Sequence, residues 1–198
     1  MSNIVFQPFI GKNYNSGGIF GKKILALGES HYCSDGEVCS DLTTKVVRNY
    51  LTATVSERWM NTFKKFERAL AGKTTSPEDS LDIWESVAFY NYLQTPMGDN
   101  RIAGAYEDYQ NAVEPFFEVL ESLRPDVIII WGQRLWDKTP SQNWTPAEPV
   151  VVDNHENKQG YYSLKNGQKI FTVAVYHHPS TSFDWNYCHK VFKTMDVL

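Results

Sequence analysis

Cysteine is scarce in this chain of 198 residues, which contains only Cys33, Cys39 and Cys188. Small secreted domains that rely on disulfides carry larger, even sets of cysteines, so this odd count argues against a disulfide framework and favours a reducing compartment. Long apolar runs are missing too, and the first residues show no basic segment followed by an apolar one. Because a membrane span needs about 20 apolar residues, we expect a soluble protein of the cytoplasm that makes no membrane contact.

Positive charge is not in excess in this sequence. Lys and Arg total 19 against 23 Asp and Glu, which gives a formal net charge of -4. Nucleic acids attract strongly basic surfaces, so this balance argues against tight non-specific binding to duplex DNA but permits a local basic patch. Four basic residues follow candidate site loops closely, and solvated helix faces explain them equally well: Arg134, Lys138, Lys190 and Lys193.

The length suits a single domain, residues 1–198, whose first 21 residues contain several glycines and predict an irregular lead-in. Apolar runs predict strands at 22–28, 86–90, 126–132, 150–152, 160–164 and 169–175. Apolar residues at steps of three and four predict helices over 41–70 and 106–123, the second kinked or restarted at Pro115, and a short closing helix that carries Cys188 to Met195. We expect a loop over 72–79 and little regular structure in the proline-containing segment after Lys138.

The order of these elements predicts the fold class. Strands and helices alternate through most of the chain, and Asn166-Gly167 is a strong signal for a hairpin before the last strand. The order favours an α/β fold, a three-layer α/β/α sandwich with a mainly parallel central sheet. Loops that begin at Gly28, Asn91, Trp131 and His177 then meet at one sheet edge, where open α/β sheets bind ligands.

Four short motifs lie at these strand ends. They are Gly28-Glu29-Ser30-His31-Tyr32, Phe89-Tyr90-Asn91, Leu123-Arg124-Pro125-Asp126 through Trp131-Gly132, and His178-Pro179-Ser180. In this order they resemble the uracil-DNA glycosylase superfamily, over roughly residue 22 to the C-terminus. The resemblance implies a uracil-DNA glycosylase-like fold and a base-excision repair enzyme that hydrolyses the N-glycosidic bond of uracil or a related damaged base. It also implies DNA as the partner, and we expect a monomer.

The resemblance assigns the catalytic roles to Glu29 and His178. Cleavage of the N-glycosidic bond builds positive charge on the deoxyribose and negative charge on the departing base. Glu29 is expected to supply an anion beneath the sugar and to orient or deprotonate the attacking water. His178 is expected to donate a hydrogen bond to uracil O2 as a neutral imidazole, and Pro179 directly after it favours it over His177.

The remaining expected contacts are to the base and to the DNA. Asn91 pairs with uracil N3 and O4, and Tyr32 stacks on the flipped base, although an asparagine at a strand end equally often satisfies loop backbone groups. Gly28, Ser30 and His31 complete the base site. The expected DNA contacts are Gln94, Thr95, Pro96, Pro179, Ser180, Thr181, Ser182 and Phe183. Ser180 to Ser182 are also candidates to cap the last helix, and Phe183 or Trp185 to wedge into the gap in the duplex, with core packing as the alternative.

Some features depart from the family pattern or suit another class. His31 stands where the family has a small residue or proline, which leaves the base preference open. Three cysteines cannot hold a four-cysteine iron–sulfur cluster, and the spacing of His31, Cys33 and Cys39, with or without Glu29, matches no common zinc pattern. We therefore expect neither metal nor cofactor.

Two other functions stay open at this stage. One is an esterase-type hydrolase with Ser30 as nucleophile and His178 or His189 as base, although the Gly-x-Ser-x-Gly elbow is absent. The other is a non-catalytic relative that keeps the fold and binds nucleic acid or a nucleotide, which the acidic balance and the altered first motif favour.

Overall fold

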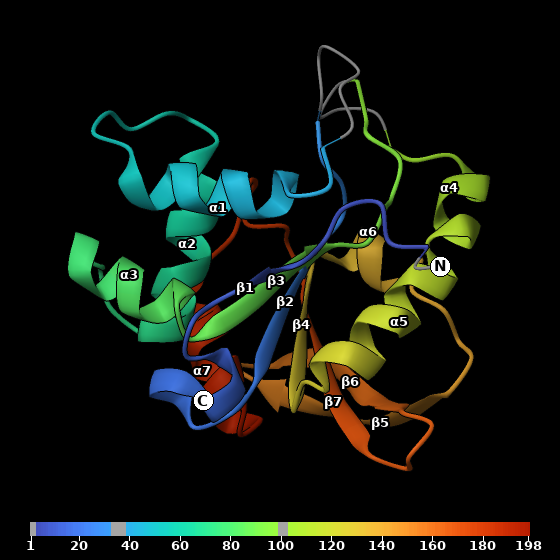
Figure 1. Ribbon diagram of the computed structural model, residues 1–198. Coiled ribbons are helices and arrows are strands. Elements are labelled where there is room, and N and C mark those ends of the chain that lie inside the picture. The colour runs from blue at the N-terminus through green and yellow to red at the C-terminus, as the bar shows by residue number, and fades with distance from the viewer. Residues whose placement is uncertain (1–2, 33–38, 99–102) are drawn as a thin grey trace.

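The computed structural model describes residues 3–32, 39–98 and 103–198, and their strands form one seven-stranded sheet (Figure 1). The sheet order is β1-β3-β2-β4-β7-β6-β5. The strands are β1 (Phe9–Ile10), β2 (Ile24–Gly28), β3 (Val87–Asn91), β4 (Val127–Trp131), β5 (Trp144–Val152), β6 (His155–Ser163) and β7 (Lys169–Val175). The helices are α1 (Leu42–Thr52), α2 (Met60–Ala71), α3 (Pro77–Trp84), α4 (Tyr106–Asn111), α5 (Val113–Leu123), α6 (Gln133–Trp136) and α7 (Trp185–Thr194).

The expected α/β class is confirmed, but the sheet is mixed and the prediction of a mainly parallel sheet is wrong. β3, β2, β4 and β7 pair in parallel, whereas β1 on β3, β6 on β7 and β5 on β6 are antiparallel. The short connections between β5, β6 and β7 allow only antiparallel pairing, because a parallel pair needs a long crossover. β5 itself runs through the segment expected to be irregular. Pro146 and Pro149 fit there because β5 is an edge strand, with a register shift between Ala147 and Val150.

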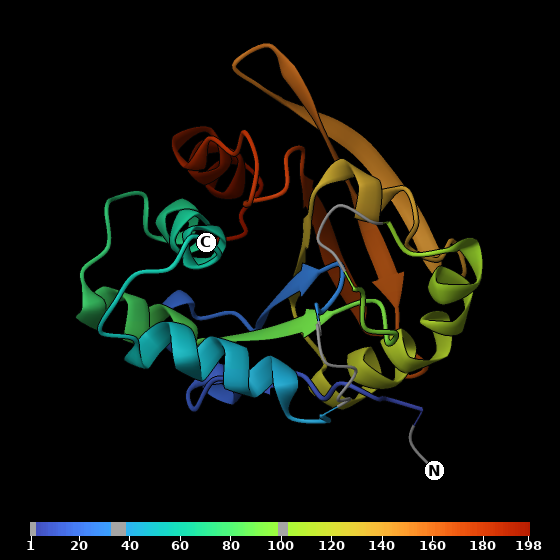
Figure 2. The same cartoon turned by 90° about the horizontal axis from the view of Figure 1, so that it is seen from above.

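Helices cover both faces of the sheet, as Figures 1 and 2 show. Successive side chains of a strand point to opposite faces, so Ile24 and Ala26 join one core and Leu25 and Leu27 the other. The first core is closed by α1, α2, α3 and α7, and the second by α4, α5 and α6. Among the described helices, none combines the length and the apolar character that a membrane crossing requires.

The helix predictions were correct in place but wrong in detail. The stretch 41–70 contains two helices, α1 and α2, separated by residues 53–59. The loop expected over 72–79 ends at Ser76, which caps α3 in a reciprocal capping box with Asp79. The stretch 106–123 is broken at Ala112, and Pro115 lies in the first turn of α5, where a missing N–H costs little.

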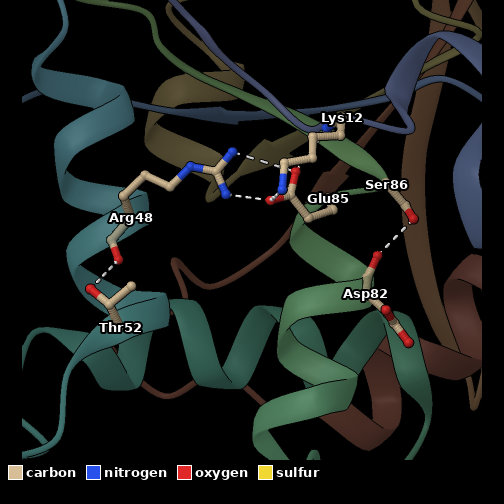
Figure 3. A network of polar contacts seen from close by, with 6 residues as sticks. All are labelled: Lys12, Arg48, Thr52, Asp82, Glu85 and Ser86. Carbon is tan, nitrogen blue, oxygen red and sulfur yellow. Dashed lines mark hydrogen bonds and ion pairs between the residues drawn. The ribbon is translucent and has the colours of Figure 1, made fainter.

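The lead-in is tied to the domain by two side chains, the partly buried Gln94 and the buried Glu85. Gln94 Oε1 accepts hydrogen bonds from the backbone N–H of Val5 (2.9 Å) and of Phe6 (3.0 Å). Glu85, at the junction of α3 and β3, accepts from the backbone N–H of Lys12 at 2.8 Å and from the Arg48 guanidinium of α1, as Figure 3 shows. The lead-in therefore packs beside β3, where its β1 extends the sheet.

Candidate active site

The carboxyl ends of the four parallel strands lie side by side, as the sequence predicts. Gly28 is paired with Asn91 across β2 and β3, and Trp131 with Val175 across β4 and β7. The loops after β2 and β3 remain joined through hydrogen bonds from the Leu93 N–H to the Glu29 carbonyl (2.8 Å) and from the Met97 N–H to the His31 carbonyl (2.8 Å). The first motif is therefore held along its length by the segment that follows Asn91.

Glu29 is the anionic centre of this edge. Its side chain is buried, Oε1 accepts a hydrogen bond from the Tyr109 hydroxyl of α4, and Oε2 accepts two from the Arg134 guanidinium of α6, one of them from Nε at 3.0 Å. Burial and the Glu29 contact raise the pKa of Tyr109, so its phenol stays protonated and donates. The same contact raises the pKa of Arg134. Glu29 thus presents a negative charge held in place by two donors, with oxygen lone pairs left for a water.

Sequence reasoning missed both partners of Glu29. Tyr109 belongs to the apolar stripe of the helix over 106–123, 80 residues from Glu29, and nothing local marks it as a site residue. Arg134 stands out only as a basic residue just after the strand that ends at Trp131. Gly132, two residues before Arg134, has φ +95°, a backbone conformation that glycine adopts readily. It lies directly before α6, the helix that carries Arg134.

His178 is held as a neutral hydrogen-bond donor. Its Nδ1 accepts from the backbone N–H of Ser180 at 3.1 Å and lies 2.7 Å from the Ser180 hydroxyl. Because a backbone N–H can only donate, Nδ1 is unprotonated and the proton of the neutral ring sits on Nε2. Burial lowers the pKa of His178 to about 4, while Glu29 opposes the shift and Arg134 adds to it. This dependence on Glu29 and Arg134 also shows that the three side chains lie within electrostatic range of one another.

Asn91 and His31 form a second, buried pair. Both side chains are almost inaccessible, and Asn91 Nδ2 lies 3.2 Å from His31 Nε2. The same imidazole nitrogen lies 2.9 Å from Thr43 Oγ1 of α1. Burial lowers the pKa of His31 to about 4. Gly28 is required beside this pair, because a Cβ at that position would lie 2.2 Å from Asn91 Oδ1.

The other expected base contacts lie around this edge. Ser30 is partly buried, and Tyr32 is 49% exposed where it bridges to Met97, so its ring is available for stacking. Among the described residues, neither histidine considered as a base for Ser30 is hydrogen-bonded to it: His178 Nδ1 contacts Ser180, and His189 Nδ1 contacts the Ala69 carbonyl at 2.9 Å.

The expected DNA contacts divide by their burial. Thr95, Ser180, Thr181 and Ser182 are exposed, Pro96 is partly buried, and Pro179 is buried. Gln94 is engaged with the lead-in, and Phe183 is 7% exposed and belongs to the core, so it cannot act as a wedge in this conformation. Trp185 also packs against that core. The proposal that Ser180 to Ser182 cap the last helix is wrong, because the Asp184 carboxylate accepts from the Asn186 and Tyr187 N–H groups at the start of α7.

No metal-binding cluster is present in the residues that the structure describes. Groups of three or more His, Cys, Asp or Glu side chains arranged for a metal ion do not occur there. Cys39 and Cys188 are free thiols, and Cys33 lies outside the described residues. Of the residues weighed as ligands, His31 faces Thr43 and Asn91, and Glu29 faces Tyr109 and Arg134.

Two surface hollows lie away from Glu29 and His178. One of about 470 Å³ borders α5, and a smaller one of about 160 Å³ lies beside Trp136 and Trp144. Neither is lined by Glu29, His31, Asn91 or His178. The Arg134 side chain, 52% exposed, contacts the buried Glu29 carboxylate and occupies its Oε2 as a hydrogen-bond donor.

Comparison of the sequence with protein-family models and with curated proteins adds no relative to this picture. No protein-family model matches the chain, and a search of curated proteins finds no match. The family resemblance therefore rests on four motifs in order. The side chains at the ends of β2, β3, β4 and β7 are therefore the basis for a functional proposal.

Proposed function

We propose that this protein is a DNA glycosylase that hydrolyses the N-glycosidic bond of uracil or a related damaged base in DNA, as part of base excision repair. The proposal depends on two functional groups at the same sheet edge. One is the buried carboxylate of Glu29, and the other is the neutral imidazole of His178, whose Nε2 is the hydrogen-bond donor. We also infer that the helices on both faces of the sheet form the three-layer α/β/α sandwich of the uracil-DNA glycosylase superfamily.

The chemistry needs opposite electrostatics on the two sides of the breaking bond. As the bond between the base and C1′ lengthens, positive charge develops on the sugar and the bonding electron pair goes to the base. In the proposed mechanism Glu29 faces the sugar, stabilises this positive charge and orients the water that attacks C1′. His178 donates its Nε2–H to the base oxygen where negative charge collects, and it needs no change of protonation state.

Base recognition is assigned to Asn91 and Tyr32. The Asn91 amide carries both an acceptor and a donor, which matches the N3–H and O4 of uracil. Tyr32 offers an exposed aromatic ring next to the first motif, and flipped bases are held by stacking on such rings.

Arg134 is assigned a role that the first motif alone does not predict. Its guanidinium covers Glu29, and half of its side chain reaches solvent. A DNA phosphate is a strong competitor for a guanidinium, because both of its oxygens match the planar fork. In the proposal, DNA binding draws Arg134 away from Glu29 and opens the carboxylate to the sugar and to water.

A second candidate function is a non-catalytic module that binds nucleic acid or a nucleotide. One observation favours it: both oxygens of Glu29 are already occupied, by Tyr109 and by Arg134. In such a module Glu29 would serve to hold Arg134 in place for a phosphate, and no bond would be broken.

A base-excision assay separates the two. Single-stranded and mismatched oligonucleotides that carry uracil, hypoxanthine, xanthine or hydroxymethyluracil are incubated with the protein, and abasic product is scored by alkaline cleavage. We expect product with at least one base, and strong loss in Glu29→Gln and in His178→Asn. The matched controls are Glu156→Gln and His177→Asn, both at exposed positions. Binding without product from any base would support the second candidate.

A further inference from the structure

The side chain of Asn91 has one end engaged and one end free. Its Nδ2 contacts His31 Nε2 at 3.2 Å, while its Oδ1 receives no hydrogen bond from the residues that the structure describes. Oδ1 lies above the Cα of Gly28, where a Cβ would stand only 2.2 Å away. The amide is therefore held from one side, and its carbonyl oxygen is available to a ligand.

The orientation of the Asn91 amide determines the tautomer of His31. The ring is 5% exposed, so it stays neutral in the physiological range, in keeping with its lowered pKa. Neutral imidazole has one acceptor nitrogen, and an amide NH2 can only donate, so Nε2 is the acceptor and Nδ1 carries the proton. The Thr43 hydroxyl lies 2.9 Å from the same nitrogen, and as a second donor it shares the single lone pair of Nε2 with the Asn91 amide.

The surroundings keep the imidazole in this position. The ring of Phe6 packs edge-on against it with centroids 4.9 Å apart, and Phe6 is itself fully buried. The backbone of His31 is fixed by the Met97 N–H. The Phe6 packing and the fixed backbone oppose a ring flip that would exchange the two nitrogens, so Nε2 stays opposite Asn91.

We propose that His31 is a positioning residue that locks the amide of Asn91 with Nδ2 turned inward and Oδ1 presented, so that the site selects bases whose ring nitrogen is a hydrogen-bond donor. The inference rests on the proposed function, since it assumes that Asn91 faces the flipped base. It gives His31, the residue that departs from the family pattern, a direct part in choosing the substrate.

The fixed orientation of the Asn91 amide discriminates between two classes of base. Uracil, hypoxanthine and xanthine carry a ring N–H beside a carbonyl, and they match Oδ1 and the remaining Nδ2 proton. Cytosine carries a ring acceptor beside an amino group, so it would place an acceptor against Oδ1 and a donor against Nδ2. A freely turning amide could flip to suit cytosine, whereas an amide held by His31 cannot flip without losing its buried hydrogen bond.

The first test measures binding, without any catalytic step. Single strands that carry one non-cleavable 2′-fluoro-2′-deoxyuridine or 2′-fluoro-2′-deoxycytidine are titrated against the wild type and His31→Phe. We expect the wild type to prefer the uracil strand by at least about tenfold, which is the effect of one mismatched buried hydrogen bond. In His31→Phe the preference falls to about twofold or less, because the amide can turn. The matched control is His177→Phe, the same change at an exposed histidine, which retains the preference.

The second test uses the wild-type protein alone, so it does not depend on the variant folding. A long-range proton–nitrogen NMR spectrum of the histidine rings should show Nδ1 protonated and Nε2 unprotonated in His31. A proton on Nε2 would overturn the inference, and so would an unchanged preference in a folded His31→Phe. If the wild type forms product from uracil DNA while either of these results is found, only the role of His31 fails. If it neither cleaves nor binds any base, the proposed function fails as well.

Discussion

Removal of the Arg134 side-chain charge should lower the free energy of unfolding by an amount that follows from the burial of Glu29 and the exposure of Arg134. In Arg134→Met the aliphatic part of the side chain is retained, but a carboxylate with an 8% exposed side chain loses its cation and keeps, of its partners among the described residues, the Tyr109 hydroxyl. Breaking a fully buried pair from one side costs about 3–5 kcal/mol. Since the Arg134 side chain is 52% exposed and solvent screens part of this interaction, we expect about 1–2 kcal/mol.

The assay is urea denaturation at pH 7, with the midpoint and slope fitted for each variant. For a domain of this size, the expected loss corresponds to a fall in Tm of roughly 2–8 °C. The matched control is Lys158→Met, because Lys158 and Asp137 form a pair at 4.0 Å in which both side chains are more than half exposed, and it should leave the midpoint unchanged. If Arg134→Met were as stable as Lys158→Met, Glu29 would not depend on Arg134, and the picture of a covered carboxylate would be wrong.

Two further predictions concern other parts of the structure. Gly28→Ala should abolish uracil excision by displacing the Asn91 amide, whereas Gly98→Ala, with open space around it, should be neutral; alkaline cleavage of the product compares the two. Burial raises the pKa of Glu85, but its bonds to Arg48 and to the lead-in outweigh this and lower it overall. The unfolded chain therefore takes up a proton first, so the stabilisation by Glu85 is complete above the unfolded pKa and is lost as the pH falls through the lower folded value. Urea midpoints should fall between about pH 5 and 3 in the wild type and fall less in Glu85→Gln, which keeps the other carboxylates with lowered pKa.

Much of the frame of the site could be predicted from local sequence. Continuous apolar runs mark β2, β3 and β4 because both faces of these strands are buried. Polar residues directly after them, such as Glu29 and Asn91, therefore fall at one edge of the parallel part of the sheet. This edge can be predicted from the positions of the strand ends and from the common direction of the parallel strands.

The partners of these residues could not be predicted in the same way. Tyr109 reaches Glu29 only because α4 packs on one face of the sheet, and the contact spans 80 residues. The pairing of His31 with Asn91 spans 60 residues and depends on Gly28 leaving room for the amide. Likewise, the sequence predicts only the end of β5, residues 150–152, because proline argues against a strand interior, and only the edge position of β5 makes Pro146 and Pro149 acceptable.

The most direct measurement of the central claim is single-turnover excision of uracil from a single-stranded oligonucleotide. We expect the wild type to convert the strand to an abasic product, and Glu29→Gln and His178→Asn each to slow the reaction by at least about a hundredfold while binding stays measurable. His177→Asn should match the wild type. Equal rates for the wild type and both site variants, or no product from the wild type, would contradict the account.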